Sequence, residues 1–281
     1  MKSPSIAELR RGALAVSVLH DVDVELSELG IVLPGVPTVW VPWGECRRAL
    51  AGHDPETTGR RRLADWLLAR RWAASLTREQ LLTRLRPVGL PVEHALHPGL
   101  DWVRERILGD ALDLGLGAVD LDPADPDRVV LLPAAVLDAA GLDQEQVWLQ
   151  ARTMLDHLGN LAAERVRRDL RGQLRPLGDC DVVTLLGSRA LRAALAHDAG
   201  GLAAAVVPMR TRGWTRLALV DPAFGPAAAR ATSPEQRGFD RPLLVTADEL
   251  TLVADGGRAE SLVLRDPAVH EEPWLKDVLY R

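Results

Sequence analysis

Apolar residues recur every three or four positions along four stretches of the chain, the spacing that places them on one face of an α-helix. Ser5 and Glu8 begin the first stretch in the arrangement of a capping box. The second stretch is expected to break near Ser75, with a new helix starting at Thr77. The pattern therefore predicts long helices over much of the first 170 residues. The four stretches are residues 5–19, 59–86, 133–141 and 143–170.

Shorter apolar runs bounded by proline, glycine and aspartate predict β-strands. Residues 117–122 and 128–132 flank a Pro-Ala-Asp-Pro-Asp loop and are expected to pair as a hairpin. A strand at 182–186 is expected to lead through a Gly-Ser pair into a helix that ends near Gly200. The remaining predicted strands are residues 39–41, 203–209, 217–220, 243–245, 250–253 and 262–264.

Prolines and glycines also predict where regular structure stops. Three prolines and two glycines favour a loop at residues 87–99, followed by a short helix at 100–108. An alanine-rich helix is expected near 222–231. The Asp-Gly-Gly sequence at 255–257 predicts a hairpin turn within an antiparallel meander.

Helices concentrate before residue 172 and hairpins after it, which predicts an α+β fold rather than a strictly alternating βαβ order. Residues 1–172 are expected to form a mainly helical region with a short β-hairpin near 117–132. Residues 179–281 are expected to form an α+β domain that contains the antiparallel meander. The expected boundary, 172–178, contains a proline and has glycine at both ends.

The composition is that of a chain with a large core. Of 281 residues, 47% are apolar, and no apolar run approaches the roughly 18 residues that span a membrane. The run at 12–19 follows Glu8 and lacks a small-residue cleavage site, so a secretion signal is not favoured, with twin-arginine export as the alternative. Two cysteines, Cys46 and Cys180, favour a reducing compartment and leave open whether they meet in space. The expected location is therefore cytoplasmic.

The most strongly charged stretch is 59–86, which carries eight arginines against Asp65 and Glu79 in a chain of net charge −5. Guanidinium groups bind phosphates and tryptophan rings stack on bases, so arginines beside tryptophans suit an anionic partner. The alternative is an amphipathic helix with its tryptophan in the core and its arginines in water. The candidate binding residues are Arg60, Arg61, Arg62, Trp66, Arg70, Arg71 and Trp72.

A second candidate site lies later in the chain. A helix that starts at a Gly-Ser pair after a strand can direct backbone N–H groups at a phosphate or carboxylate. Two arginines separated by one residue on a strand lie on the same face and could clamp an anion, or else pair with surface carboxylates. The sequence lacks a Walker lysine and a full dinucleotide-binding glycine set. The candidates are Gly187, Ser188, Arg210 and Arg212 for the anion, and Asp179 and Asp181 for acid/base or metal chemistry.

Other patterns typical of metal or nucleophile chemistry are incomplete. His94 and His97 are three residues apart, but prolines bracket them and no third ligand is indicated. The acidic loop at 120–127 lacks the glycine and terminal glutamate of an EF-hand. Neither cysteine has a histidine beside it to act as a base. No metal and no cofactor are therefore expected.

No motif names a reaction, so two functions remain open. The leading hypothesis is a non-catalytic cytosolic protein that engages a protein or another anionic macromolecule through the Arg/Trp segment 59–86. The alternative is an enzyme acting on a small phosphate- or carboxylate-bearing substrate at the Gly187-Ser188 helix start. The net negative charge does not favour nucleic acid as the partner. The sequence leaves the partner, the reaction and the oligomeric state open.

Overall fold

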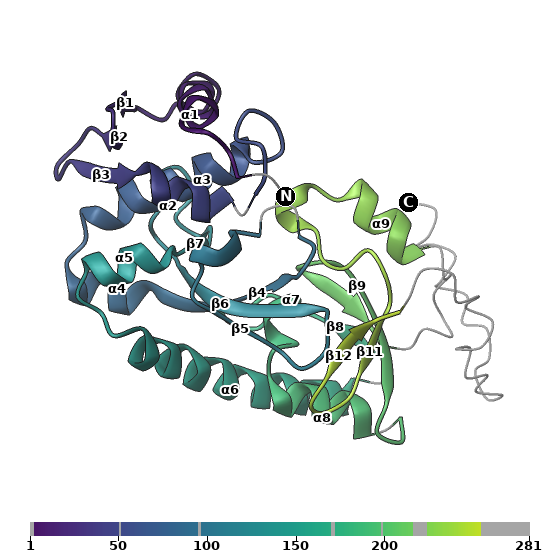
Figure 1. Ribbon diagram of the computed structural model, residues 1–281. Helices are drawn as coiled ribbons and strands as arrows, with labels where there is room; N and C mark the ends of the chain where they lie inside the picture. The colour runs from purple at the N-terminus through teal and green to yellow at the C-terminus, as the bar shows by residue number, and fades with distance from the viewer. Residues whose placement is uncertain are drawn as a thin grey trace.

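The computed structural model describes residues 3–50, 52–94, 97–169, 172–197, 199–215 and 224–253. These residues form helices and three antiparallel sheets, so the predicted α+β class is confirmed. In Figure 1 the N-terminal elements, in purple and blue, gather at the upper left, and the C-terminal strands lie at the right. None of the described helices is both long enough and apolar enough to cross a membrane.

Most of the predicted helices are present. The helices begin where the sequence provides caps: the Ser5 hydroxyl accepts the Glu8 backbone N–H at 3.3 Å, and Thr77 pairs with Gln80 in the same way. The α-helices of the described chain are α1 (Ile6–His20), α2 (Trp43–Leu50), α3 (Arg60–Ala74), α4 (Arg78–Arg84), α5 (Ala134–Ala139), α6 (Gln144–Arg168), α7 (Val182–Leu185), α8 (Arg189–His197) and α9 (Phe224–Ala231). Two short 3-10 helices are η1 (Gly99–Asp101) and η3 (Pro234–Gln236).

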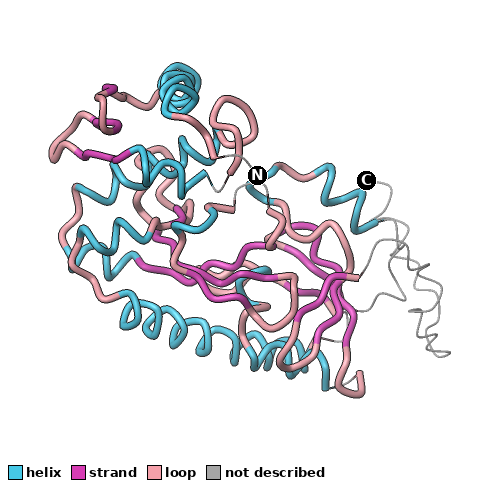
Figure 2. The backbone as a smooth tube through the Cα atoms, in the orientation of Figure 1, coloured by secondary structure: helices cyan, strands magenta, loops and turns pink. Residues whose placement is uncertain are grey.

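The strands of the second and third sheets lie at the centre and right of the molecule, and those of the first sheet lie at the upper left (Figure 2). The first sheet has the order β1-β2-β3, the second β4-β6-β5 with β7 also paired to β6, and the third β12-β11-β9-β10-β8. Their bounds are β1 (Glu25–Leu26), β2 (Gly30–Leu33), β3 (Val39–Pro42), β4 (Leu85–Pro91), β5 (Arg104–Arg106), β6 (Leu112–Ala118), β7 (Val130–Leu131), β8 (Gln173–Leu174), β9 (Ala203–Met209), β10 (Arg212–Trp214), β11 (Leu243–Val245) and β12 (Leu250–Leu252).

Separate apolar clusters hold these elements together. The first sheet packs with α1, α2 and α3 around buried side chains that all lie between Leu9 and Leu67. The largest cluster joins Leu112 and Leu114 of β6 to α6, α7, α8 and the third sheet. It therefore combines residues from both sides of residue 172, and the domain division remains a prediction. Cys46 belongs to the first of these clusters, and both Cys46 and Cys180 are buried free thiols.

The prediction of a loop at 87–99 and a helix at 100–108 is wrong. β4 continues to Pro91, and β5 begins at Arg104. β4 is an edge strand whose only partner among the described strands is β6. The Gly89 N–H points away from β6 and donates to the Thr184 hydroxyl at 2.8 Å. Pro87 and Pro91 share this outward orientation because strand residues alternate, so their missing N–H groups cost no ladder hydrogen bond.

The predicted strand at 182–186 is also wrong, because this segment forms α7. Asp181 is its N-cap and accepts the Thr184 backbone N–H at 2.7 Å. A short apolar run that is buried on every side fits a helix and a strand equally well, so its periodicity does not distinguish them. β9 pairs with β10. The predicted elements at 217–220, 255–257 and 262–264 lie outside the described residues.

The contact between α6 and α8 depends on the absence of a side chain at Gly159. A Cβ added there would lie 1.9 Å from the Ser188 hydroxyl oxygen and 2.3 Å from its Cβ. We therefore expect Gly159→Ala to destabilise the protein by about 1–3 kcal/mol, although alanine favours helices. Adding Ser188→Gly should recover that loss, as measured by urea denaturation. If Gly159→Ala had the same free energy of unfolding as the wild-type protein, α6 and α8 would be able to separate at no cost, and the close contact would not be required.

Candidate functional site

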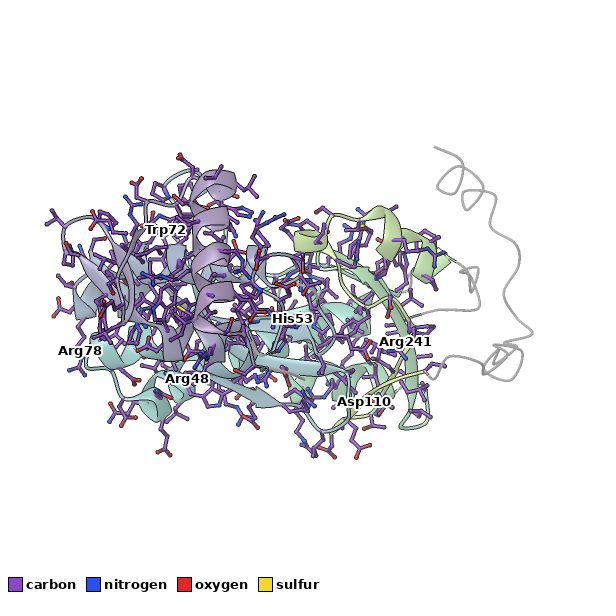
Figure 3. All side chains as sticks on the ribbon, turned by 45° about the horizontal axis from the view of Figure 1, so that its top comes forward. Arg48, His53, Trp72, Arg78, Asp110 and Arg241 are labelled. Atoms are coloured by element: carbon purple, nitrogen blue, oxygen red, sulfur yellow. The ribbon has the colours of Figure 1, made fainter. Side chains whose placement is uncertain are left out.

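A cavity of about 640 Å³ lies where α3, strands β4 and β7, and the segment that ends β9 approach one another. Its volume is within the range of small-molecule sites, roughly 300–1,000 Å³. The residues that line it run from Arg61 to Gln236 along the sequence; Figure 3 labels Trp72 among the side chains of the N-terminal helices at the left and Arg241 in the C-terminal part at the right. The cavity is therefore built from segments far apart in the sequence.

One wall of the cavity is apolar. Val88 and Leu90 of β4 and Leu131 of β7 contribute to it, together with Trp66 and the half-buried Trp72 of α3. Trp66 is 4% exposed, and its indole N–H donates to the Asp101 carboxylate at 2.8 Å. This hydrogen bond satisfies the only polar atom of the ring, so the rest of the indole serves as a fixed apolar surface.

Arg62 is a buried cation without an ionic partner. Its side chain lines the cavity and is 8% exposed, yet no carboxylate of the described residues lies within ion-pair distance. Its Nη1 donates to the Leu50 carbonyl at 3.4 Å, at the C-terminal end of α2, and its buried Nε has no hydrogen-bond partner. Burial lowers the pKa of Arg62 below its usual range. The group remains charged, so it favours an anion beside it.

The other arginines at the cavity are paired with carboxylates. Arg61 binds Asp65 at 3.1 Å and lies 3.7 Å from Glu235. Arg128, from the loop before β7, binds the same Asp65 at 3.1 Å and Asp122 at 3.1 Å. This chain of ion pairs links α3 to the loop at 122–128. It orders one edge of the cavity and leaves those charges compensated.

Arg210 and Asp181 form a second ordered pair at the cavity. The Arg210 Nε donates to Asp181 Oδ2 at 2.6 Å, and Asp181 Oδ1 accepts the Thr184 backbone N–H at 2.7 Å. Both oxygens of Asp181 are therefore occupied by groups of the protein. The arrangement positions Arg210 at the wall but provides no proton acceptor for a substrate.

The structure brings together residues from both predicted sites. Arg61, Arg62, Trp66 and Trp72 of the first candidate set, and Asp181 and Arg210 of the second, all line the same cavity. The other arginines of the first set lie elsewhere on α3. Arg70 pairs with Glu45 at 2.5 Å, and Arg71 lies 3.6 Å from Asp23. Arg60 donates to the carbonyl of Glu56, a residue outside the cavity lining.

Four residues of the second candidate set do not line the cavity. Asp179 pairs with Arg86 at 2.6 Å. Ser188 is 1% exposed, and its hydroxyl packs against Gly159 without a hydrogen-bond partner in the described structure. Gly187 packs close to a leucine of β6, and Arg212 lies exposed on β10. The helix before this Gly-Ser pair replaces the strand that the predicted anion cradle requires.

His94 lines the cavity as well, a position that its sequence context did not indicate. The two histidines do not act as a pair, because His97 instead lies 3.1 Å from Asp113. The described residues contain no cluster of His, Cys, Asp and Glu able to hold a metal ion. Burial, followed by the positive charge of Arg210, lowers the pKa of His94 to about 4, so the imidazole is neutral at pH 7.

Asp113 is a buried carboxylate at the centre of an ionic network beside the second sheet, in which Arg106 is half exposed. Arg104 lies 2.7 Å from its carboxylate, and Arg106 lies 2.8 Å from it. The Gly99 N–H donates to His97 Nδ1 at 3.1 Å, and His97 Nε2 lies 3.1 Å from Asp113 Oδ2 and 2.7 Å from Arg104 Nη1. None of these residues lines the cavity, so the network supports the sheet behind it.

The lowered pKa of His94 predicts a pH-dependent stability. The unfolded chain takes up a proton near pH 6.5, whereas folded His94 takes it up only near pH 4. The contribution of His94 to the free energy of unfolding is therefore fully present above pH 6.5. The free energy of unfolding falls by up to about 3 kcal/mol as the pH falls to 4. In His94→Gln, which titrates no proton, the loss between pH 7 and 4 should shrink by most of this amount. Urea denaturation at each pH measures the free energy of unfolding of both proteins. If the two plots of this free energy against pH are parallel, the lowered pKa of His94 is contradicted.

No family model, curated protein or solved structure matches this chain. The geometry of the cavity is therefore the observation that bears on function. That geometry combines an apolar wall, an unpaired buried guanidinium and a rim of paired charges. Such an arrangement can hold an organic anion by one charged group and several apolar contacts.

Proposed function

We propose that the protein binds a small organic anion in this cavity, with Arg62 as its main ionic partner. The proposal rests on the buried guanidinium of Arg62. The Arg62 side chain lines a cavity of about 640 Å³, and its Nε has no hydrogen-bond partner in the described structure. An uncompensated buried charge is costly for folding. A bound carboxylate, phosphate or sulfonate at the cavity face of the guanidinium would neutralise the charge.

The composition of the cavity supports a ligand with a single negative charge. Four arginines line it, but five carboxylates do as well. Each of the other arginines already has a carboxylate partner, which leaves only Arg62 without one. A ligand with several negative charges would be repelled by the acidic rim residues Asp125 and Asp127. A monoanion with an apolar body therefore fits best.

The geometry gives less support to binding of a macromolecule by the Arg/Trp segment. That function needs exposed cations and exposed aromatic rings on one face of α3. Trp66 is buried, and Arg61, Arg70 and Arg71 are paired with carboxylates of the same chain. The positive charge of α3 is thus largely compensated within the protein.

Octanoate and 1-octanol test the proposed function because they share the same apolar tail and differ in charge. We expect octanoate to bind the wild-type protein at least tenfold more tightly than 1-octanol in isothermal titration calorimetry. Binding should weaken only modestly with added salt, because buried charge pairs are screened less than exposed ones. Equal affinities for the two compounds, or no binding of octanoate, would contradict the proposal.

A further inference from the structure

A second cavity of about 200 Å³ lies beside the first. Its walls include the buried side chains of Phe239 and Ala229, together with Pro91 and the partly buried Leu252. Charged groups of both signs lie at its edge, among them Glu93, which pairs with Arg241 at 3.1 Å. Part of the lining is therefore apolar, beside the partly buried Arg237, and the volume is enough for a short hydrocarbon segment.

His94 is the one residue that lines both cavities among those that the structure describes. The neighbouring 3-10 helix η3 contributes to the same partition, because Pro234 faces the smaller cavity while Glu235 and Gln236 face the larger. The imidazole is 7% exposed. The two cavities are thus separated by one side chain and one short turn of backbone.

The main chain of His94 is fixed by the turn after β4. Its N–H donates to the Pro91 carbonyl at 2.9 Å, and its carbonyl accepts the His97 N–H at 2.9 Å. Truncation of the imidazole would leave both backbone hydrogen bonds in place. Because the ring is neutral at pH 7, its removal also changes no charge at the cavity. Truncation therefore adds space and also removes the hydrogen bonds between the imidazole and the backbone of Arg237 and Pro234.

We propose that His94 is a specificity-determining residue that limits the length of the ligand's apolar tail by separating the two cavities. The inference rests on the proposed function and names the ligand class more closely: an anion with an unbranched hydrocarbon tail. In the wild-type protein the tail ends against the imidazole. Without the ring, the tail reaches the apolar space at Phe239 and Ala229.

Straight-chain carboxylates from hexanoate to tetradecanoate test this inference by isothermal titration calorimetry. In the wild-type protein, affinity should rise about fourfold per methylene and then level off at the length where the tail meets His94. In His94→Ala the rise should continue over at least two further methylenes. The exposed His157 of α6 provides the matched control, since His157→Ala should keep the wild-type limit.

A second change tests whether the extra length enters the smaller cavity. The double variant His94→Ala/Ala229→Leu fills that cavity and should return the length limit to the wild-type value. His94→Ser, which retains a small polar side chain, replaces His94→Ala if the latter loses the native near-ultraviolet circular dichroism. An unchanged limit in the folded variants would overturn the role of His94 while octanoate still binds. Failure of octanoate to bind any form would instead overturn the proposed function.

Discussion

Arg62→Met is expected to weaken octanoate binding about 100-fold without lowering the free energy of unfolding. The loss corresponds to one or two charge-assisted hydrogen bonds to the carboxylate, each worth about 1.5–3 kcal/mol. Methionine has a similar length, favours helices and has no charge to bury. Since Arg62 has no ionic partner in the described chain, its removal leaves no carboxylate uncompensated.

This combination of effects distinguishes a binding residue from a structural one. A structural buried arginine, when replaced, costs stability because its partner loses a counter-charge. Calorimetry with octanoate and urea denaturation of the same samples measure the two quantities together. Arg71→Met is the matched control on the same helix, with expected octanoate binding equal to wild type. Unchanged binding in Arg62→Met, or a loss of stability above about 2 kcal/mol, would contradict the role of Arg62.

Asp113→Ala is expected to have the largest effect on stability, a loss of about 3–5 kcal/mol. The carboxylate is 1% exposed and lies within 2.8 Å of both Arg104 and Arg106. Its removal leaves Arg104 and Arg106 beside the sheet without this counter-charge. Urea denaturation of Asp113→Ala and of the isosteric Asp113→Asn measures the loss, with the exposed Glu164→Ala as control.

The pKa of Asp113 determines how this contribution depends on pH. Burial alone raises the pKa, but hydrogen bonds from His97 and Arg106 and the charge of Arg104 outweigh it and hold the pKa well below its usual range. The network therefore stabilises the fold at all pH values above the usual aspartate range and weakens only in stronger acid. A loss of less than about 1 kcal/mol in Asp113→Ala at pH 7 would show that the network contributes little.

The helices were predictable where local chemistry determines them. Ser5 with Glu8, and Thr77 with Gln80, satisfy backbone groups within one turn, so the sequence alone indicates these helix starts. The strand at β4 was not predictable in this way. Its prolines are tolerated because they face away from β6, and that orientation depends on a partner strand more than 20 residues later.

The sequence indicates many of the residues of the candidate site but not that they lie together. It indicates two separate sets of residues, and no local pattern shows that Arg62 and Arg210 line one cavity. The sequence does contain a pattern that indicates the burial of Arg62 rather than of Arg60 or Arg61. Arg62 and Trp66 are four residues apart and share a face of α3, so the arginine nearest the core was the one beside the tryptophan. Only tertiary packing reveals that its counter-charge is missing.

A crystal structure of the protein with 8-bromooctanoate tests whether the anion binds at Arg62, because the bromine marks the end of the tail. We expect the carboxylate to lie within about 3.2 Å of a nitrogen of the Arg62 guanidinium. The bromine should lie along the apolar wall formed by Val88, Leu90 and Trp66. A carboxylate bound to any other arginine, or a ligand bound outside the cavity, would contradict the account.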